Sequence, residues 1–565
     1  MNWTERALPQ AAWQELTHSG IDPLFARLLA SRGVTQALDV ATDLGHLLPP
    51  QQLKGVEQAA ALLGLAVQQG RTVCVVADYD CDGATACAVA CRGLQMLGAT
   101  RVEFEVPDRQ KDGYGLTPAI AQRVRTRGAD VLVTVDNGIA SVEGVRTARQ
   151  LGLQVLVTDH HLPGDQLPLA DALVNPNQPG CDFPSKHLAG VGVMFYVLLA
   201  TRAWLREHGH FKDRPEPRLD SLLPLVALGT VADVVSLDAN NRRLVHQGLE
   251  RIRRGAMPAG LRALFEVAGR DFRHAHSQDL GFALGPRINA AGRLANMRIG
   301  IECLLIDDTA QATQWALQLD GINRERREVE SDMREQAQAL AESRLADPST
   351  RSALCLYDAQ FHEGVIGIVA GRLKDLHHRP TFVFAPAREQ PGLLKGSGRS
   401  IAGFHLRDAL DALSKQHPGL LQQFGGHAMA AGCTLRADAL ERFEAALQDL
   451  ARRWIDPNDL QRLWVTDGDL PPPGWRVDFF KTLEQQVWGA GFAAPLYVSD
   501  WRVLAQRQVG ERHLKLRLGR EDLEVDGIWF GRADPLPAQA RLLYRPQINR
   551  WQGRESLQVQ VEAMA

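Results

Sequence analysis

The chain has 565 residues, of which 45% are hydrophobic and 23% charged, and its formal net charge is −3. This length is too great for one core and favours two to four domains, while the composition is that of a globular rather than a disordered protein. The net charge excludes a generally basic protein, so a polyanionic partner would have to bind at a local positive surface.

Two features of the sequence indicate the cellular compartment in which the protein works. The N-terminal sequence MNWTERALPQ lacks the charged and apolar regions of a secretory signal, and no apolar run approaches the roughly 18 residues of a membrane span. None of the eight cysteines belongs to a Cys-x-x-Cys pair, which argues against a zinc ribbon or a disulfide framework. We therefore expect a cytoplasmic protein without a membrane partner.

The N-terminal half alternates between helix and strand patterns. Residues 1–50 indicate short helical pieces, and residues 51–307 indicate a first α/β domain. Within it, the valine-rich runs 72–77, 130–135 and 154–158 are typical of strands buried on both faces of a parallel sheet. Because a helical pattern follows each of the first two runs, we expect a doubly wound domain.

The C-terminal half has three further segments. Residues 308–346 contain almost no helix-breaking residue and predict one long connecting helix. Residues 347–453 indicate a second, smaller α/β domain. Residues 454–565 contain short strand patterns with glycines between them, which predict a small β-barrel or sandwich. The expected fold class is therefore multidomain α/β with a C-terminal β-domain.

Acidic and imidazole side chains follow all three valine-rich strands. They are Asp78, Asp80 and Asp82 after the first strand, Asp136 after the second, and Asp159, His160 and His161 after the third. The carboxyl ends of parallel strands share one edge of the sheet, so these side chains should converge there. One such aspartate alone is more typical of a helix N-cap, but three strand ends with the same chemistry favour a common site.

The expected cluster needs positive charge, because carboxylates a few ångströms apart in a partly buried site repel one another. Divalent cations would neutralise it, and oxygen-rich ligands with imidazole suit Mn²⁺ or Mg²⁺ better than zinc. The number of carboxylates suggests two ions bridged by one of them. That arrangement is typical of enzymes that cleave phosphoesters.

Six short motifs carry a resemblance to a known family. They are DYDCDG (78–83), VDNG (135–138), DHH (159–161), GTVADVVSL (229–237), GPRINAAGRL (285–294) and GGHAMAAG (425–432). Together they resemble the DHH phosphoesterase superfamily and, within it, the bacterial RecJ family of single-stranded-DNA-specific 5′→3′ exonucleases. The resemblance runs from about residue 50 to the C-terminus. It implies two-metal hydrolysis of single strands to 5′-mononucleotides, in DNA recombination and repair.

The resemblance also implies roles for the clustered residues. Asp80 and Asp82 would each hold one ion, and Asp136 would bridge the two ions. His160 and Asp233 would complete one site, while His161 would face the scissile phosphate. Asp78 would either ligate an ion or orient its neighbours.

Further residues are implied for substrate binding. The candidates for the 5′-phosphate are Arg109, Arg287, Ser397, Arg399 and His427, and Ser397 and Arg399 belong to a candidate anion nest. Two alternatives remain open, since GSGR is also typical of a plain turn and GGHAMAAG of close backbone packing.

The C-terminal domain resembles the OB-like barrel of this family, which binds single strands through basic and aromatic side chains. The candidates there are Lys515, Arg517, Arg545, Arg550 and Trp551. From the resemblance alone we expect a monomer that associates with a single-stranded-DNA-binding protein and a recombination helicase.

Three other functions are compatible with parts of the pattern. They are a phosphodiesterase for cyclic dinucleotides or very short oligonucleotides, a manganese pyrophosphatase, and a non-catalytic DNA-binding helicase subunit. The OB-like domain favours a polynucleotide substrate over the first, and Val76 stands where the second has a histidine. Every candidate metal ligand is present, which favours catalysis over the third.

Overall fold

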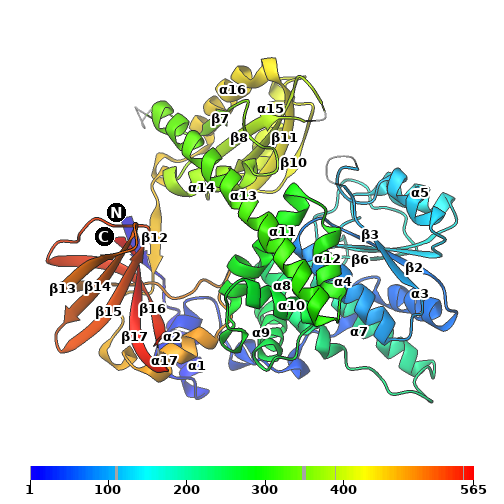
Figure 1. Ribbon diagram of the computed structural model, residues 1–565, viewed down its shortest axis with the longest axis horizontal. Helices are drawn as coiled ribbons and strands as arrows, with labels where there is room; N and C mark the ends of the chain where they lie inside the picture. Colours follow the sequence, from blue (N-terminus) through cyan, green and yellow to red (C-terminus); the bar gives the residue numbers. More distant parts are fainter. Residues whose placement is uncertain (1, 109–111, 346–350, 389, 552) are drawn as a thin grey trace. The chain divides into compact units, whose positions relative to one another are not determined.

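The computed structural model describes residues 2–108, 112–345, 351–388, 390–551 and 553–565. The chain forms two compact units, one made of Trp3–Asp320 and Val465–Ala565, the other essentially of Gly321–Trp464. Figure 1 shows the elements of each unit. The expected multidomain α/β fold class is confirmed, and no described helix has both the length and the apolar character of a membrane span.

A five-stranded parallel sheet lies at the centre of the first unit. Its strand order is β3-β2-β4-β5-β6, with bounds β2 Val73–Ala77, β3 Val102–Glu105, β4 Val131–Val135, β5 Gln154–Thr158 and β6 Ala172–Val174. In register, Ala77 lies beside Val135 and Val135 beside Thr158. Three strands therefore end at the same level, so the residues that follow them meet at one edge of the sheet.

Helices cover both faces of this sheet, because β2 and β4 are buried along their whole length. Val73, Val75 and Ala77 contribute to one core, while Cys74 and Val76 contribute to the other. In Figure 1, α5 lies on one side of the sheet, and α3 and α7 lie on the other. The helices are α3 (Val56–Gln68), α4 (Cys81–Met96), α5 (Pro118–Thr126), α6 (Val142–Gln150), α7 (Gly190–Glu207), α8 (Leu223–Ala232), α9 (Ala239–Arg253), α10 (Ala259–Val267), α11 (Gly285–Leu294) and α12 (Arg298–Leu305).

The N-terminal segment contains α1 (Gln10–His18) and α2 (Pro23–Ala30), as its helical pattern predicts. It also contains an unexpected strand, β1 (Asn2–Glu5), which pairs with β12 (Leu463–Thr466) from far along the chain. Short turns of helix complete this unit: η1 (Ala37–Val40), η2 (Leu44–His46), η3 (Pro50–Gln52), η4 (Leu219–Leu222), η5 (Phe272–His274), η10 (Pro472–Gly474) and the π-helical η6 (Asp279–Leu284).

The C-terminal β-domain is a closed barrel in the order β13-β14-β15-β17-β16. Its strands are β13 (Tyr497–Val509), β14 (His513–Arg520), β15 (Leu523–Phe530), β16 (Gln539–Trp551) and β17 (Arg554–Met564), and α17 (Val477–Gln485) precedes them. The β15–β17 pair is parallel and the other pairs are antiparallel. Alternate residues of β14, namely Leu514, Leu516 and Leu518, are buried in its core.

The second unit has a mixed sheet in the order β10-β11-β9-β8-β7, in which only β7 and β8 are parallel. Its elements are β7 (Leu354–Tyr357), β8 (Thr381–Pro386), β9 (Leu393–Arg399), β10 (Gln423–Gly426), β11 (Ala430–Arg436), α14 (Ile366–His377), α15 (Leu406–Gln416), α16 (Leu440–Trp454), η8 (Ala437–Ala439) and η9 (Pro457–Leu460).

A single helix of 36 residues, α13 (Thr309–Arg344), continues from the first unit into the second. Ala312, Ala316 and Leu319 belong to a core of the first unit. Met333 and Ala337 belong to a core of the second unit. The helix is therefore anchored by apolar contacts in each unit, and the long connecting helix expected from the sequence is confirmed.

Candidate metal centre

The acids and imidazoles that follow the strands do converge. His160 Nε2 lies 3.1 Å from Asp136 Oδ1, 3.4 Å from Asp233 Oδ2 and 3.9 Å from Asp82 Oδ2. Three overlapping groups have ligand atoms within 4.8 Å of one another: Asp78, Asp80 and Asp136; Asp82, His160 and Asp233; and Asp136, His160 and His161. The structure thus brings together seven residues that the sequence analysis placed in one site, and we call them the metal cluster.

The loop that follows β2 is fixed by contacts with neighbouring residues and with the distant helix α11. Asp80 caps α4, since its Oδ1 accepts a hydrogen bond of 2.9 Å from Gly83 N. Cys81 N donates to Asn289 Oδ1 on α11 at 2.8 Å. A Cβ atom at Gly292 would lie 1.9 Å from the Tyr79 carbonyl oxygen, so α11 approaches this loop more closely than another residue would permit. Sequence reasoning singled out the motif of α11 but missed this role of Asn289.

The N-terminus of α7 holds Asp82. Gly190 N donates to Asp82 Oδ2 at 2.6 Å, and Val191 N donates to Oδ1 at 3.0 Å. Unpaired amides at a helix N-terminus favour a carboxylate in this way. A Cβ atom at Gly190 would lie 2.5 Å from Asp136 Oδ1, so this glycine lets α7 reach two acids of the cluster.

Replacing Gly190 with alanine is expected to push Asp136 out of place and to weaken Mn²⁺ binding roughly tenfold or more, as for other contacts that orient ligands. Isothermal titration with Mn²⁺ would measure this. Gly164→Ala is the matched control, because nothing lies within 4 Å of a Cβ atom there. Wild-type Mn²⁺ affinity in a folded Gly190→Ala protein would contradict the role given to this glycine.

Asp136 has an unusual backbone. Its φ is +61°, in the left-handed region that few non-glycine residues other than asparagine and aspartate adopt. Its neighbour Asn137 donates from Nδ2 to Val76 O at 3.1 Å and to Val135 O at 2.9 Å. These bonds join the ends of β2 and β4 beneath the cluster and stabilise the turn that presents the Asp136 carboxylate.

Asp159 is a further residue whose role sequence reasoning missed. It is buried, and its Oδ1 accepts from the backbone N of His160 and His161 and lies 2.7 Å from His161 Nδ1. Its Oδ2 accepts from Ile139 N at 2.9 Å. Burial alone would lower the pKa of His161, but the hydrogen bond and charge of Asp159 outweigh it and raise this pKa to about 9. Asp159 therefore orients the His161 ring and favours its protonated form.

The carboxyl groups of the cluster are buried close to one another, and this raises the pKa values of four of them. Burial, followed by the charge of Asp80, raises the pKa of Asp78 to about 8 and that of Asp82 to about 7. Burial and the charge of Asp82 hold the pKa values of Asp136 and Asp233 well above the ordinary range. The carboxylates of the cluster outnumber its positively charged groups. Its five carboxylates and two imidazoles form an oxygen-rich donor set that fits divalent cations such as Mn²⁺ or Mg²⁺.

The candidates for phosphate binding lie in different surroundings. Arg287 is buried on α11, where Nε and Nη2 lie 2.9 Å from Asp320 Oδ1 and Nη1 donates to the Ala283 carbonyl. In the second unit, Arg399 Nη1 donates to Ser397 Oγ at 3.2 Å. His427 lies in the turn between β10 and β11. Arg109 lies outside the described residues.

The basic candidates of the barrel are paired with acids. Arg517 pairs with Glu524 at 2.7 Å, Arg545 with Glu562 at 3.0 Å, and Arg550 with Glu484 at 2.7 Å. Lys515 lies 3.7 Å from Asp526. The side chain of Trp551 lies outside the described part of the chain.

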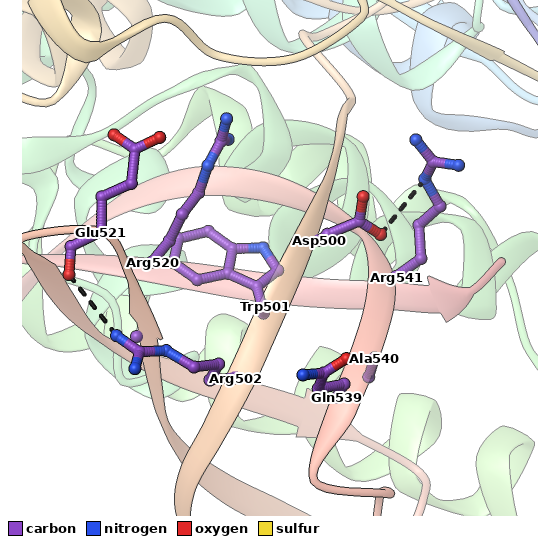
Figure 2. Close-up of a pocket in the computed structure, with 9 residues that line it drawn as sticks. Asp500, Trp501, Arg502, Arg520, Glu521, Gln539, Ala540 and Arg541 are labelled. Carbon is purple, nitrogen blue, oxygen red and sulfur yellow. Dashed lines mark hydrogen bonds and ion pairs between the residues drawn. The ribbon is translucent and has the colours of Figure 1, made fainter.

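Sequence reasoning missed a different arginine group on the barrel. A pocket of about 370 Å³ there has Arg502, Arg520 and Arg541 among its lining residues. Figure 2 shows these side chains around Trp501, with Arg541 directed to Asp500. The indole of Trp501 is almost fully buried, and its Nε1 has no hydrogen-bond partner among the described residues.

Comparisons with known proteins agree with this architecture. The model of the DHH family N-terminal domain matches residues 72–230, that of the DHHA1 domain residues 350–453, and that of the RecJ OB domain residues 466–563. The single-stranded-DNA-specific exonuclease RecJ of Escherichia coli (strain K12) is 46% identical over 554 residues, which cover 96% of each chain. The chain belongs to the RecJ family.

Other RecJ proteins extend the comparison. RecJ of Dickeya dadantii is 47% identical over 95% of each chain. The crystal structure of RecJ from Thermus thermophilus in complex with Mn²⁺ has a TM-score of 0.81 and 31% identity, and covers 100% of this chain and 78% of that chain. Its complex with Mg²⁺ has a TM-score of 0.76 and 30% identity, covering 100% and 77%.

Proposed function

We propose that this RecJ-family exonuclease hydrolyses single-stranded DNA from the 5′ end and releases 5′-mononucleotides, using two Mn²⁺ or Mg²⁺ ions. One observation carries the proposal: five carboxylates and two imidazoles from separate segments form three overlapping groups, and the ligand atoms of each group lie within 4.8 Å of one another. The proposed ligands of the ions are Asp78, Asp80, Asp82, Asp136, His160 and Asp233.

When bound, such ions supply a water-derived nucleophile near neutral pH and stabilise negative charge on the scissile phosphate and the leaving oxygen. Asp136, which belongs to two of the three groups, is suited to bridge the ions. The amides of Gly190 and Val191 keep Asp82 in one orientation. His161, held in place by Asp159, would donate a hydrogen bond to an oxygen of the scissile phosphate.

The second unit is proposed to bind the 5′-phosphate through Ser397, Arg399 and His427. Arg399 and Ser397 lie on the same strand in hydrogen-bonding contact, and Arg399 is opposite Ala430 on β11, the strand that follows the turn of His427. A planar guanidinium next to a hydroxyl matches the oxygens of a phosphate. Arg287 differs, because its guanidinium pairs with Asp320, and we propose that it holds α11 against α13.

The direction of digestion is testable with end-labelled single strands. A 5′ label should appear at once as a mononucleotide, whereas a 3′ label should remain on strands that shorten gradually. A strand whose 5′ end lies in a duplex should resist, and EDTA should stop the reaction. The opposite label pattern would contradict the proposed direction. Cleavage of cyclic dinucleotides without digestion of strands would favour the phosphodiesterase function instead.

We further propose that the protein acts as a monomer in the cytoplasm, beside a single-stranded-DNA-binding protein and a recombination helicase. The resemblance supports the partners, and the eight buried free thiols support a reducing compartment. Light scattering of the purified chain, alone and with each partner, would test the monomer and the associations.

A further inference from the structure

Val234, which follows Asp233 of the metal cluster, has an unusual conformation. Its φ is +62°, although a β-branched residue in the left-handed region is a genuine outlier. It lies just after the end of α8, where glycine is the residue usually found. Val234 is nevertheless 70% exposed as a residue, so packing within the protein does not account for a valine there.

Two other exposed apolar side chains adjoin the cluster. Leu162 follows His161 directly and is 56% exposed. Tyr114 is 50% exposed, and its hydroxyl oxygen lies 3.4 Å from His161 Nε2. Tyr114, Leu162 and Val234 thus each adjoin the cluster, through a neighbour in sequence or a ring contact, and we call them the apolar rim.

We propose that the apolar rim binds the nucleobases that flank the scissile phosphate of a single-stranded substrate. The inference rests on the proposed function, which places that phosphate at the metal cluster. The faces of the bases are the apolar part of a nucleotide, and a strand with its phosphate on the cluster has bases within reach of side chains beside it. Contacts to base faces tolerate every sequence but require unpaired bases.

The backbone strain at Val234 favours a role in contacting the substrate over a purely structural role. Glycine would adopt the same φ without steric cost, so a residue needed only to end α8 would be better as glycine. Backbone strain that persists beside a functional site is typical of a side chain that acts there. Asp136 likewise combines a positive φ with a side chain that belongs to the cluster.

Replacing Val234 with glycine distinguishes a contact with the DNA bases from a role in ending α8. The substitution should leave the melting temperature unchanged or higher, since it relieves the strain. It should raise KM for single-stranded DNA roughly tenfold, the value expected for loss of one apolar contact. The Mn²⁺ concentration for half-maximal rate should stay that of the wild type, and Val234→Ile should retain most of the affinity for DNA.

A substrate with abasic nucleotides at its 5′ end provides the second arm of the test. On that strand Val234→Gly should change kcat/KM less than twofold, because the base that Val234 contacts is missing. An unchanged KM on normal DNA, an equal loss on both strands, or a weaker Mn²⁺ response would each overturn the proposal. A wild-type protein that does not digest normal single strands would refute the proposed function instead.

Leu162 offers a matched pair in the same loop. Leu162→Ser should raise KM several-fold. Leu169→Ser should not, because Leu169 is 79% exposed but does not adjoin the cluster. Equal effects of the two substitutions would mean that exposed apolar surface in general, rather than the apolar rim, contributes to DNA binding.

Discussion

Replacing Asp136 with asparagine is expected to lower kcat for DNA hydrolysis by about 10²- to 10³-fold or more, while affinity for single-stranded DNA changes little. The carboxylate lies 3.1 Å from His160 Nε2 and belongs to two of the three groups of candidate ligands. Its loss should disturb both ion sites together. Contacts to bases and to other phosphates remain.

Asparagine is the right substitution because Asp136 has a φ of +61°. Asparagine tolerates this conformation nearly as well as aspartate, whereas alanine would add backbone strain to the loss of the carboxylate. Initial rates at saturating Mn²⁺, together with fluorescence anisotropy of labelled strands, would separate catalysis from binding.

The control for this substitution is Asp165→Asn, which neutralises an exposed aspartate of the first unit outside the cluster. It should digest DNA at the wild-type rate. Substantial hydrolysis by Asp136→Asn would contradict the bridging role. Loss of DNA binding in the same variant would mean that the cluster acts mainly in binding, as in a non-catalytic relative.

Removing divalent cations is expected to abolish hydrolysis and to destabilise the protein by an amount that increases from pH 6 to pH 8. The folded-state pKa values of Asp78 and Asp82 rise to about 8 and about 7 from an ordinary value of 3.8. Folding of the metal-free protein therefore takes up protons in this range. That stability is fully present below pH 4 and is lost as pH rises through the folded-state values.

Bound cations offset this loss of stability at higher pH, because they replace the protons and neutralise the ionised carboxylates. The rise in melting temperature on adding Mn²⁺ should therefore be several degrees larger at pH 8 than at pH 6, at about 2–4 °C for each kcal/mol. Differential scanning fluorimetry with EDTA or Mn²⁺ would measure it, with Asp136→Asn as the variant expected to lose most of the shift. A shift independent of pH would contradict binding at these carboxylates.

Part of the site follows from local sequence. A run of buried apolar residues followed by acids predicts a strand with polar groups at its carboxyl end, and the shared edge of a parallel sheet brings such ends together. Asp78, Asp136 and His160 could therefore be assigned to one site. Local patterns also predict the long helix and a small β-barrel or sandwich, because residue periodicity and the placement of glycines are properties of neighbouring residues. The closure of five strands into a barrel was decided by the tertiary structure.

Other parts required the tertiary structure. The contact of Gly190 with Asp136 and that of Asn289 with the loop of Cys81 join segments far apart in the chain, as does the pairing of β1 with β12. The positive φ of Val234 is likewise invisible in its sequence. The sequence by itself determined which chemical groups are present and which strand ends carry them. The packing of α7, α8 and α11 decided their orientation, because close approach and backbone strain depend on contacts between distant segments that no local pattern encodes.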